Sequence, residues 1–129
     1  MCLMNTRFSL IKRRGEYIGV GYKQMQELEI PPFGKWHSAK YDPTKPTYTK
    51  SDAKSKTITC ENMLDQYIVG FHIFLNEWAA RNYSSKSKAV VYRVEFKNVT
   101  AFGSNTTYLN QSDADCVVAQ DIRYIERLS

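Results

Sequence analysis

The sequence predicts an α+β fold, built from a mostly antiparallel sheet with one main short helix and a long irregular loop. Three observations support this prediction. Residues 89–96 alternate between two sets of side chains, as in a strand. Residues 74–83 place apolar side chains at helical spacing. All four prolines lie within residues 26–57, where they interrupt regular structure and indicate a loop of about thirty residues.

Two short strands are expected before the loop. Residues 7–11 alternate weakly, residues 12–15 read as a turn, and residues 16–25 form a second strand. In that second strand Gly19, Gly21 and Lys23 share one face, and Tyr22 lies on the other. Two glycines on one face leave room for a crossing helix, another backbone or a ligand.

After the loop, residues 57–60 and 66–69 are short strand candidates, and a helix follows them. Asn76 is the expected N-cap, and Glu77 in the first turn complements the helix dipole. The helix should end near Tyr83. Its expected apolar face consists of Phe74, Trp78, Ala79 and Tyr83.

The C-terminal third predicts mostly extended structure. Residues 84–88 form a polar turn before the strand at 89–96. Residues 102–103 and 110–113 carry turn signals. Residues 116–128 are expected to form two strands or one bent strand.

Length and cysteine content bound the class of protein. A chain of 129 residues fits a single domain, residues 1–129. Its three cysteines are scattered and form no CxxC pair, which argues against a disulfide framework or a zinc site. No apolar run reaches the length of a membrane span, and no signal-peptide pattern opens the sequence. We therefore expect a cytoplasmic protein with no membrane partner.

Basic residues are concentrated in the first half of the chain. Residues 1–60 contain eleven Lys and Arg against five Asp and Glu, whereas residues 61–129 contain seven against eight. Aromatic side chains lie among the lysines of the loop from Lys35 to Lys56. This composition suits a phosphorylated or nucleic-acid partner, and it equally suits a solvated loop pinned to its own domain.

No complete set of catalytic groups is evident. There is no GxGxxG or GxxxxGK[ST] motif, and Asp113 and Asp115 are too generic a pair to define a metal site. Cys60 and Cys116 read as core thiols. His72, between Phe71 and Ile73, suits a hydrogen-bonded structural role or a ligand contact. We expect no catalytic residue, no metal and no cofactor, and a non-enzymatic protein is favoured.

Several short motifs carry a family resemblance over most of the chain outside residues 26–57. The motifs are, in chain order, Met1-Cys2-Leu3, Gly21-Tyr22-Lys23, Gly70-Phe71-His72, Trp78-Ala79-Ala80, residues 89–96 and residues 117–122. In this order they resemble a group of small bacterial and phage proteins whose function is not established, which implies a bacterial host cell.

A more distant resemblance is to ADP-ribosyltransferase-like folds, which place an Arg or His early and a Glu late. This chain has Tyr22 and Lys23 at the early position and no Glu in residues 115–121. The resemblance therefore implies a degenerate enzyme, or an ability to hold a nucleotide without transferase activity.

Three functional hypotheses follow. The first is a non-enzymatic binding protein, such as a phage anti-defence accessory protein, that holds a nucleotide-like ligand or a host protein. The second is the degenerate ADP-ribosyltransferase. The third is a nucleic-acid or nucleoprotein binder that uses the basic loop, and a homo-oligomer is compatible with each. The candidate ligand-binding residues combine aromatic and cationic groups: Tyr22, Lys23, Trp36, His72 and Arg93.

Overall fold

The protein is nearly all sheet. The computed structural model describes residues 18–26, 30–39, 57–59, 66–83, 89–106 and 113–128. The predicted α+β class is wrong, because the helix found in these ranges has only five residues and the strands extend further than their sequence signals. The elements found there are β1 (Gly19–Gln26), β2 (Trp36–Ser38), β3 (Thr57–Thr59), β4 (Gln66–Ile68), β5 (Phe71–Phe74), α2 (Glu77–Arg81), β6 (Ala89–Thr106) and β7 (Asp113–Arg127).

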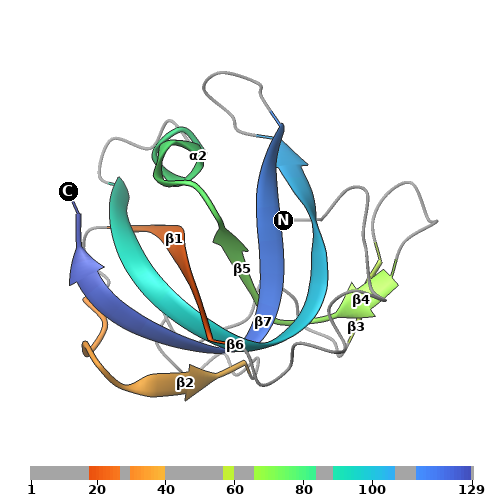
Figure 1. Cartoon of the computed structure of the whole chain (residues 1–129), viewed down its shortest axis with the longest axis horizontal. Helices are drawn as coiled ribbons and strands as arrows, with labels where there is room; N and C mark the ends of the chain where they lie inside the picture. Colours follow the sequence, from red (N-terminus) through yellow and green to blue (C-terminus); the bar gives the residue numbers. More distant parts are fainter. Residues whose placement is uncertain are drawn as a thin grey trace.

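Four of the strands close into a ring. The main sheet has the order β2-β7-β5-β1-β6, and β6 also pairs with β7. This additional pairing joins β7, β5, β1 and β6 into a closed antiparallel sheet, with β2 attached to β7. Figure 1 shows β6 and β7 bending together around β1 and β5, with the β3–β4 hairpin to one side. Closure leaves β2 at the edge of the main sheet.

An apolar cluster fills the inside of the ring, and the two glycines of β1 make room for it. A Cβ on Gly19 would lie 2.4 Å from the Phe96 ring, and one on Gly21 would lie 2.5 Å from Ile73. The side chains of Phe96 and Ile73 fill this space. The inner cluster consists of Met25, Phe71, Ile73, Val90, Tyr92, Val94, Phe96, Val117, Ala119, Ile122 and Tyr124.

A second cluster lies between the sheet and α2. Asn76 is the N-cap as predicted, although its side chain makes no cap hydrogen bond. Trp78 is 43% exposed, so its predicted place on the buried face is wrong. Ala79, also predicted on that face, is buried together with Ala80, and their small side chains let this short helix approach the sheet closely. Cys116 is buried in the same cluster, in agreement with its interpretation as a core thiol.

Strand pairing extends into two segments predicted to be irregular. Within the expected loop, β2 pairs with β7, and a three-residue strand leaves no periodic signal in the sequence. The predicted turn at residues 102–103 is wrong, because Phe102 and Gly103 lie inside β6 and pair with Val117 and Cys116. Of the two alternatives predicted for residues 116–128, the structure has the single strand, which is β7.

Several other predictions lie outside the described residues. These are the strand at 7–11, the turns at 84–88 and 110–112, and residues 40–56 of the basic loop. Among the described residues, no helix is long and apolar enough to cross a membrane.

Candidate binding surface

The five candidate residues separate into two groups. Lys23 and His72 meet at the seam between β1 and β5, whereas Tyr22, Arg93 and Trp36 belong to the outward-facing side of the sheet. The separation follows from strand geometry, because successive side chains of a strand point to opposite faces. The sequence neighbours Tyr22 and Lys23 are divided in this way.

The seam group serves the fold. The Lys23 Nζ donates a hydrogen bond to the backbone oxygen of His72 at 3.0 Å. The β1–β5 register contains a single pair, Tyr22 with Phe74. The lysine therefore adds a hydrogen bond between two strands that share little backbone pairing. This arrangement favours a structural role for Lys23.

His72 is buried on the opposite face of β5 from the inner cluster. Its side chain is 1% exposed, and its Nε2 lies 2.9 Å from the Tyr67 hydroxyl. The two rings also meet edge to face, with centroids 5.7 Å apart. A ligand in solvent would reach this imidazole only if the protein opened locally, so His72 suits the structural role considered from the sequence.

The outer face is formed by β1, β6, β7 and β2, in that spatial order. Val20, Glu95, Arg123 and Trp36 lie opposite one another and form a middle row across the four strands. Residues directly opposite in antiparallel strands place their side chains on the same face. An adjacent row, which we call the Tyr22 row, contains Tyr22, Arg93 and Glu126. The row on the other side, which we call the Lys97 row, contains Lys97, Asp121 and Ser38.

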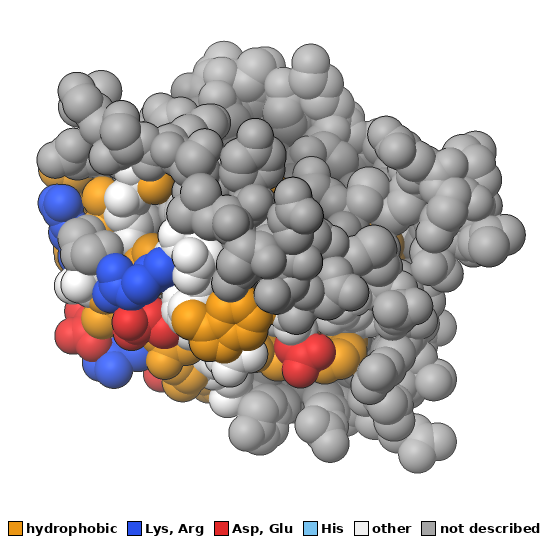
Figure 2. Space-filling view, turned by 90° about the horizontal axis from the view of Figure 1, so that it is seen from above, with side chains coloured by type: hydrophobic (Ala, Val, Ile, Leu, Met, Phe, Trp, Pro, Cys, Tyr) orange, Lys and Arg blue, Asp and Glu red, His pale blue; other side chains and the backbone are white. Residues whose placement is uncertain are grey.

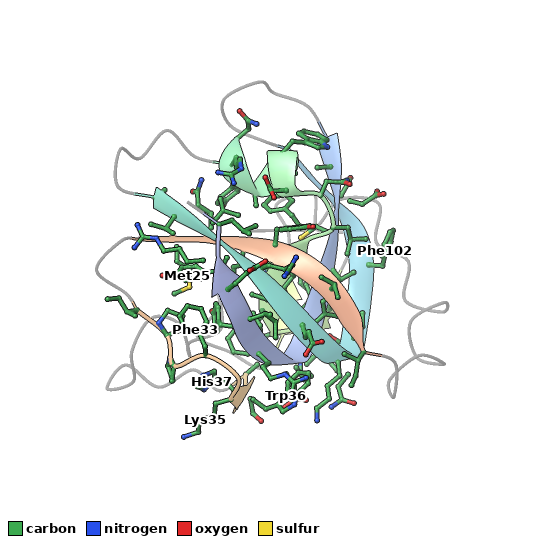
Figure 3. All side chains as sticks on the ribbon, turned by 60° about the vertical axis from the view of Figure 1, so that its left-hand side comes forward. Met25, Phe33, Lys35, Trp36, His37 and Phe102 are labelled. Atoms are coloured by element: carbon green, nitrogen blue, oxygen red, sulfur yellow. The ribbon has the colours of Figure 1, made fainter. Side chains whose placement is uncertain are left out.

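Trp36 is flanked by two cations. The Lys97 Nζ lies 4.3 Å from the centroid of the indole ring, and the Arg123 Cζ lies 4.7 Å from it. Trp36 is directly opposite Arg123, and Lys97 projects from β6 in the row beside it. Figure 3 shows Trp36 on the β2 segment, with Lys35 and His37 beside it in the chain. We call Trp36, Lys97 and Arg123 the Trp36 site.

Ion pairs balance part of the charge on this face. Arg123 pairs with Glu95, and Arg93 pairs with Glu126, in both cases across β6 and β7. Among the described residues, Lys97 and Lys35 form no ion pair. Lys97 projects from the outer face, so it is the cation of this surface best placed to meet an anion from solution.

Hydrogen bonds around Asn98 and Asp121 support the Trp36 site. Asn98 has a positive φ of 57°, and its amide donates to the Asp121 carboxylate, which also accepts from the Ser38 hydroxyl at 2.9 Å. Asp121 thus joins β6, β7 and β2, directly opposite Lys97 and two residues from Arg123. This carboxylate holds the three strands that supply the site.

His37 lies on the reverse side of β2. Its ring centroid is 6.2 Å from that of Tyr124, and Phe33 of the same segment lies 5.9 Å from Tyr92. Burial, and secondly the positive charge of Lys35, lower the pKa of His37 below its ordinary value of 6.5. The β2 segment therefore presents Trp36 to solvent while His37 anchors it on the inner aromatic pair.

Lys97 and Arg123 were not among the residues predicted from the sequence. The alternation of residues 89–96 places Arg93 and Glu95 outward, but Lys97 follows the predicted strand end. Arg123 could be assigned to the Trp36 site only by knowing that β2 pairs with β7. No local signal contains that pairing.

Comparisons with family models, curated proteins and solved structures give no significant match to this chain. Among the described residues, no group of three or more His, Cys, Asp or Glu side chains is arranged to hold a metal ion. The chemistry of the Trp36 site is therefore the main guide to function.

Proposed function

We propose that this protein is a non-enzymatic binding protein that holds a nucleotide-like anion at the Trp36 site. The observation that carries the proposal is the position of Lys97 and Arg123 over the indole ring of Trp36. A flat aromatic surface bordered by cations matches a ligand that has both an aromatic base and phosphate groups.

The site offers each part of such a ligand a distinct partner. A base stacks on the indole and replaces one of the two cations over the ring. Stacking of a base on an aromatic side chain is worth about 1–3 kcal/mol. Lys97, once displaced from the ring, then meets phosphate.

The biological setting of this proposal is a phage or bacterial accessory protein that sequesters a nucleotide signal in the host cytoplasm. This setting is supported by the sequence resemblance and by the presence of a stacking surface on a small domain. A host protein is the other occupant considered for this surface. The buried position of His72 lends no support to an ADP-ribosyltransferase. Nucleic-acid binding through the basic loop depends mostly on residues 40–56, outside the described residues.

Tryptophan fluorescence can test the proposal, because the chain has only two tryptophans. In a Trp78→Phe background, Trp36 is the sole indole. We expect cyclic dinucleotides, NAD, ADP-ribose or ATP, titrated in turn, to include at least one ligand that quenches this emission and raises the melting temperature. Trp36→Ala should abolish the thermal shift, and Lys97→Gln should weaken binding roughly tenfold, the equivalent of about 1.4 kcal/mol.

Trp78 provides the matched control. Trp78 is an exposed tryptophan, but it lies on α2 and not at the Trp36 site. Trp78→Ala should therefore leave the thermal shift unchanged. Absence of quenching and stabilisation with every member of the panel would remove small nucleotides as ligands. A thermal shift that survives Trp36→Ala would place binding elsewhere.

A further inference from the structure

The outer face exposes apolar side chains around its charged centre. Val20 is 54% exposed, Ile18 is 49% exposed and Ile125 is 36% exposed. Ile18 immediately precedes β1 on the same side as Val20, and Ile125 lies between Arg123 and Glu126 on β7. Exposed aliphatic side chains beside Trp and Arg are typical of protein contact surfaces.

The order of residue types across this face has a two-fold pattern. The middle row reads apolar, acidic, basic, apolar, from Val20 through Glu95 and Arg123 to Trp36. In the Tyr22 row, Arg93 on β6 faces Glu126 on β7, so the charges of the two strands are reversed. In the Lys97 row, Lys97 on β6 is again opposite an acid, Asp121.

We propose that the outer face binds a second copy of this chain, with a two-fold axis parallel to the strands between β6 and β7. Rotation about that axis lays β6 of one copy over β7 of the other, and β1 over β2. Each row then faces its own reverse, which is the requirement for an isologous contact.

The middle row, and the β6 and β7 positions of the other two rows, then meet complementary residues. In the middle row, Val20 lies over Trp36 of the second copy and Glu95 lies over its Arg123. In the Tyr22 row, Arg93 lies over Glu126 of the second copy. In the Lys97 row, Lys97 lies over Asp121 of the second copy. The intrachain ion pairs thus become two-layered charge networks, with apolar contacts on either side.

Charge complementarity within one surface is the reason for choosing a second copy as the partner. An unrelated protein would have to match three rows whose charge order alternates, whereas a second copy matches them by symmetry. Like charges opposed across an interface strongly disfavour association. The self-matching pattern therefore favours this alignment of the two copies over alignments that would bring like charges together. Trp36 belongs to both the contact and the proposed ligand site, so a bound nucleotide and a second copy exclude each other.

Two charge reversals test the axis directly. In Glu95→Lys, the new lysine faces Arg123 of the second copy. In Arg123→Glu, the new glutamate faces Glu95 of the second copy. We expect each variant alone to self-associate at least about tenfold more weakly than the original protein, by analytical ultracentrifugation or light scattering. An equimolar mixture should form a heterodimer, because both interchain contacts are then attractive.

Glu77 and Arg81 supply a matched control. They form an exposed ion pair 2.9 Å long on α2, which packs beside Tyr22 but supplies no residue to the three rows. Figure 2, which views the molecule from the α2 side, shows acidic and basic side chains next to hydrophobic ones. Glu77→Lys and Arg81→Glu make the same charge changes and break a similar pair, and they should leave self-association unchanged. Circular dichroism of all four variants checks that each is folded.

Each outcome decides the proposal. A heterodimer formed only by the mixed Glu95→Lys and Arg123→Glu variants supports it. A chain that stays monomeric at several hundred micromolar overturns it, as does a dimer insensitive to both reversals. Loss of the dimer without rescue on mixing overturns the proposed axis. The fluorescence titration, carried out at low micromolar protein, reports on the ligand site regardless of this result.

Discussion

The seam between β1 and β5 and the outer face of the same sheet use similar side chains for different purposes. At the seam, the Lys23 ammonium satisfies a backbone oxygen and the His72 ring is buried against Tyr67. On the outer face, Lys97 lies over the partly exposed ring of Trp36 and forms no ion pair among the described residues. A cation and an aromatic ring thus support the fold in one place and form an accessible surface in the other.

The difference lies in what each strand face meets. Lys23 and Tyr22 are adjacent in the chain, yet only Tyr22 shares a face with Arg93. The side of β1 that carries Gly19 and Gly21 turns toward the packed interior, and the side that carries Val20 turns toward solvent. Burial therefore alternates residue by residue from Ile18 to Gly21, and substitutions there should alternate in their effect.

Gly21→Ala should produce the largest effect on stability. Its Cβ would lie 2.5 Å from the Ile73 side chain and 2.8 Å from the backbone oxygen of Phe74, which cannot easily move aside. Overpacking of this kind costs about 1–3 kcal/mol and sometimes more. We expect a loss near the upper end of that range, measured by chemical denaturation.

Val20→Ala, one position away, is the control for this prediction. Val20 is exposed, so its truncation should change the free energy of unfolding by no more than about 0.5 kcal/mol. Equal losses at the two positions would mean that the two faces of β1 are not different environments.

The sequence predicted the parts of this fold that depend on local alternation. The antiparallel sheet, the strand at residues 89–96, the hairpin strands near 57 and 66 and the Asn76 N-cap all have local signals. The Gly19 and Gly21 pair correctly indicated close approach on one face of β1. Its cause is the packing of Phe96 and Ile73 inside a closed ring, which depends on strands more than fifty residues apart.

The candidate site was predictable only in part, for the same reason. Trp36 was identifiable as an aromatic residue among lysines, but its neighbours Lys97 and Arg123 come from strands about 60 and 90 residues further along the chain. The α+β class failed because the helical spacing of residues 74–83 produces only five helical residues. Local periodicity overestimated a helix whose length is set by how much sheet surface it can cover.

Tyr67→Phe should have a moderate effect, because it tests the seam side of the comparison without creating a cavity. The variant removes the hydroxyl 2.9 Å from the His72 Nε2 and keeps the ring packing. A buried hydrogen bond contributes about 0.5–1.5 kcal/mol, so we expect the free energy of unfolding to fall by about 1 kcal/mol in denaturation experiments.

Arg93→Gln, on the outer face, breaks a half-exposed ion pair and should lower the free energy of unfolding by less than about 0.5 kcal/mol. A larger loss for Arg93→Gln would show that the outer face also stabilises the fold.

The smallest effect should come from His37, which anchors the segment that presents Trp36 on the outer face. Burial and Lys35 lower its pKa in the folded protein, whereas the unfolded chain takes up the proton near pH 6.5. Below pH 6.5 the unfolded state therefore binds more protons, so neutral His37 stabilises the fold above this pH and loses that contribution as the pH falls through its lowered pKa. Between pH 7.5 and pH 5, the melting temperature of the original protein should fall more than that of His37→Gln.

Lys35→Gln should move the pKa of His37 back toward 6.5 in an NMR titration, and an unchanged titration would mean that the lysine is not near enough to matter. Because the Trp36 indole sits on the same three-residue strand, its emission should change over the same pH range in the original protein and not in His37→Gln.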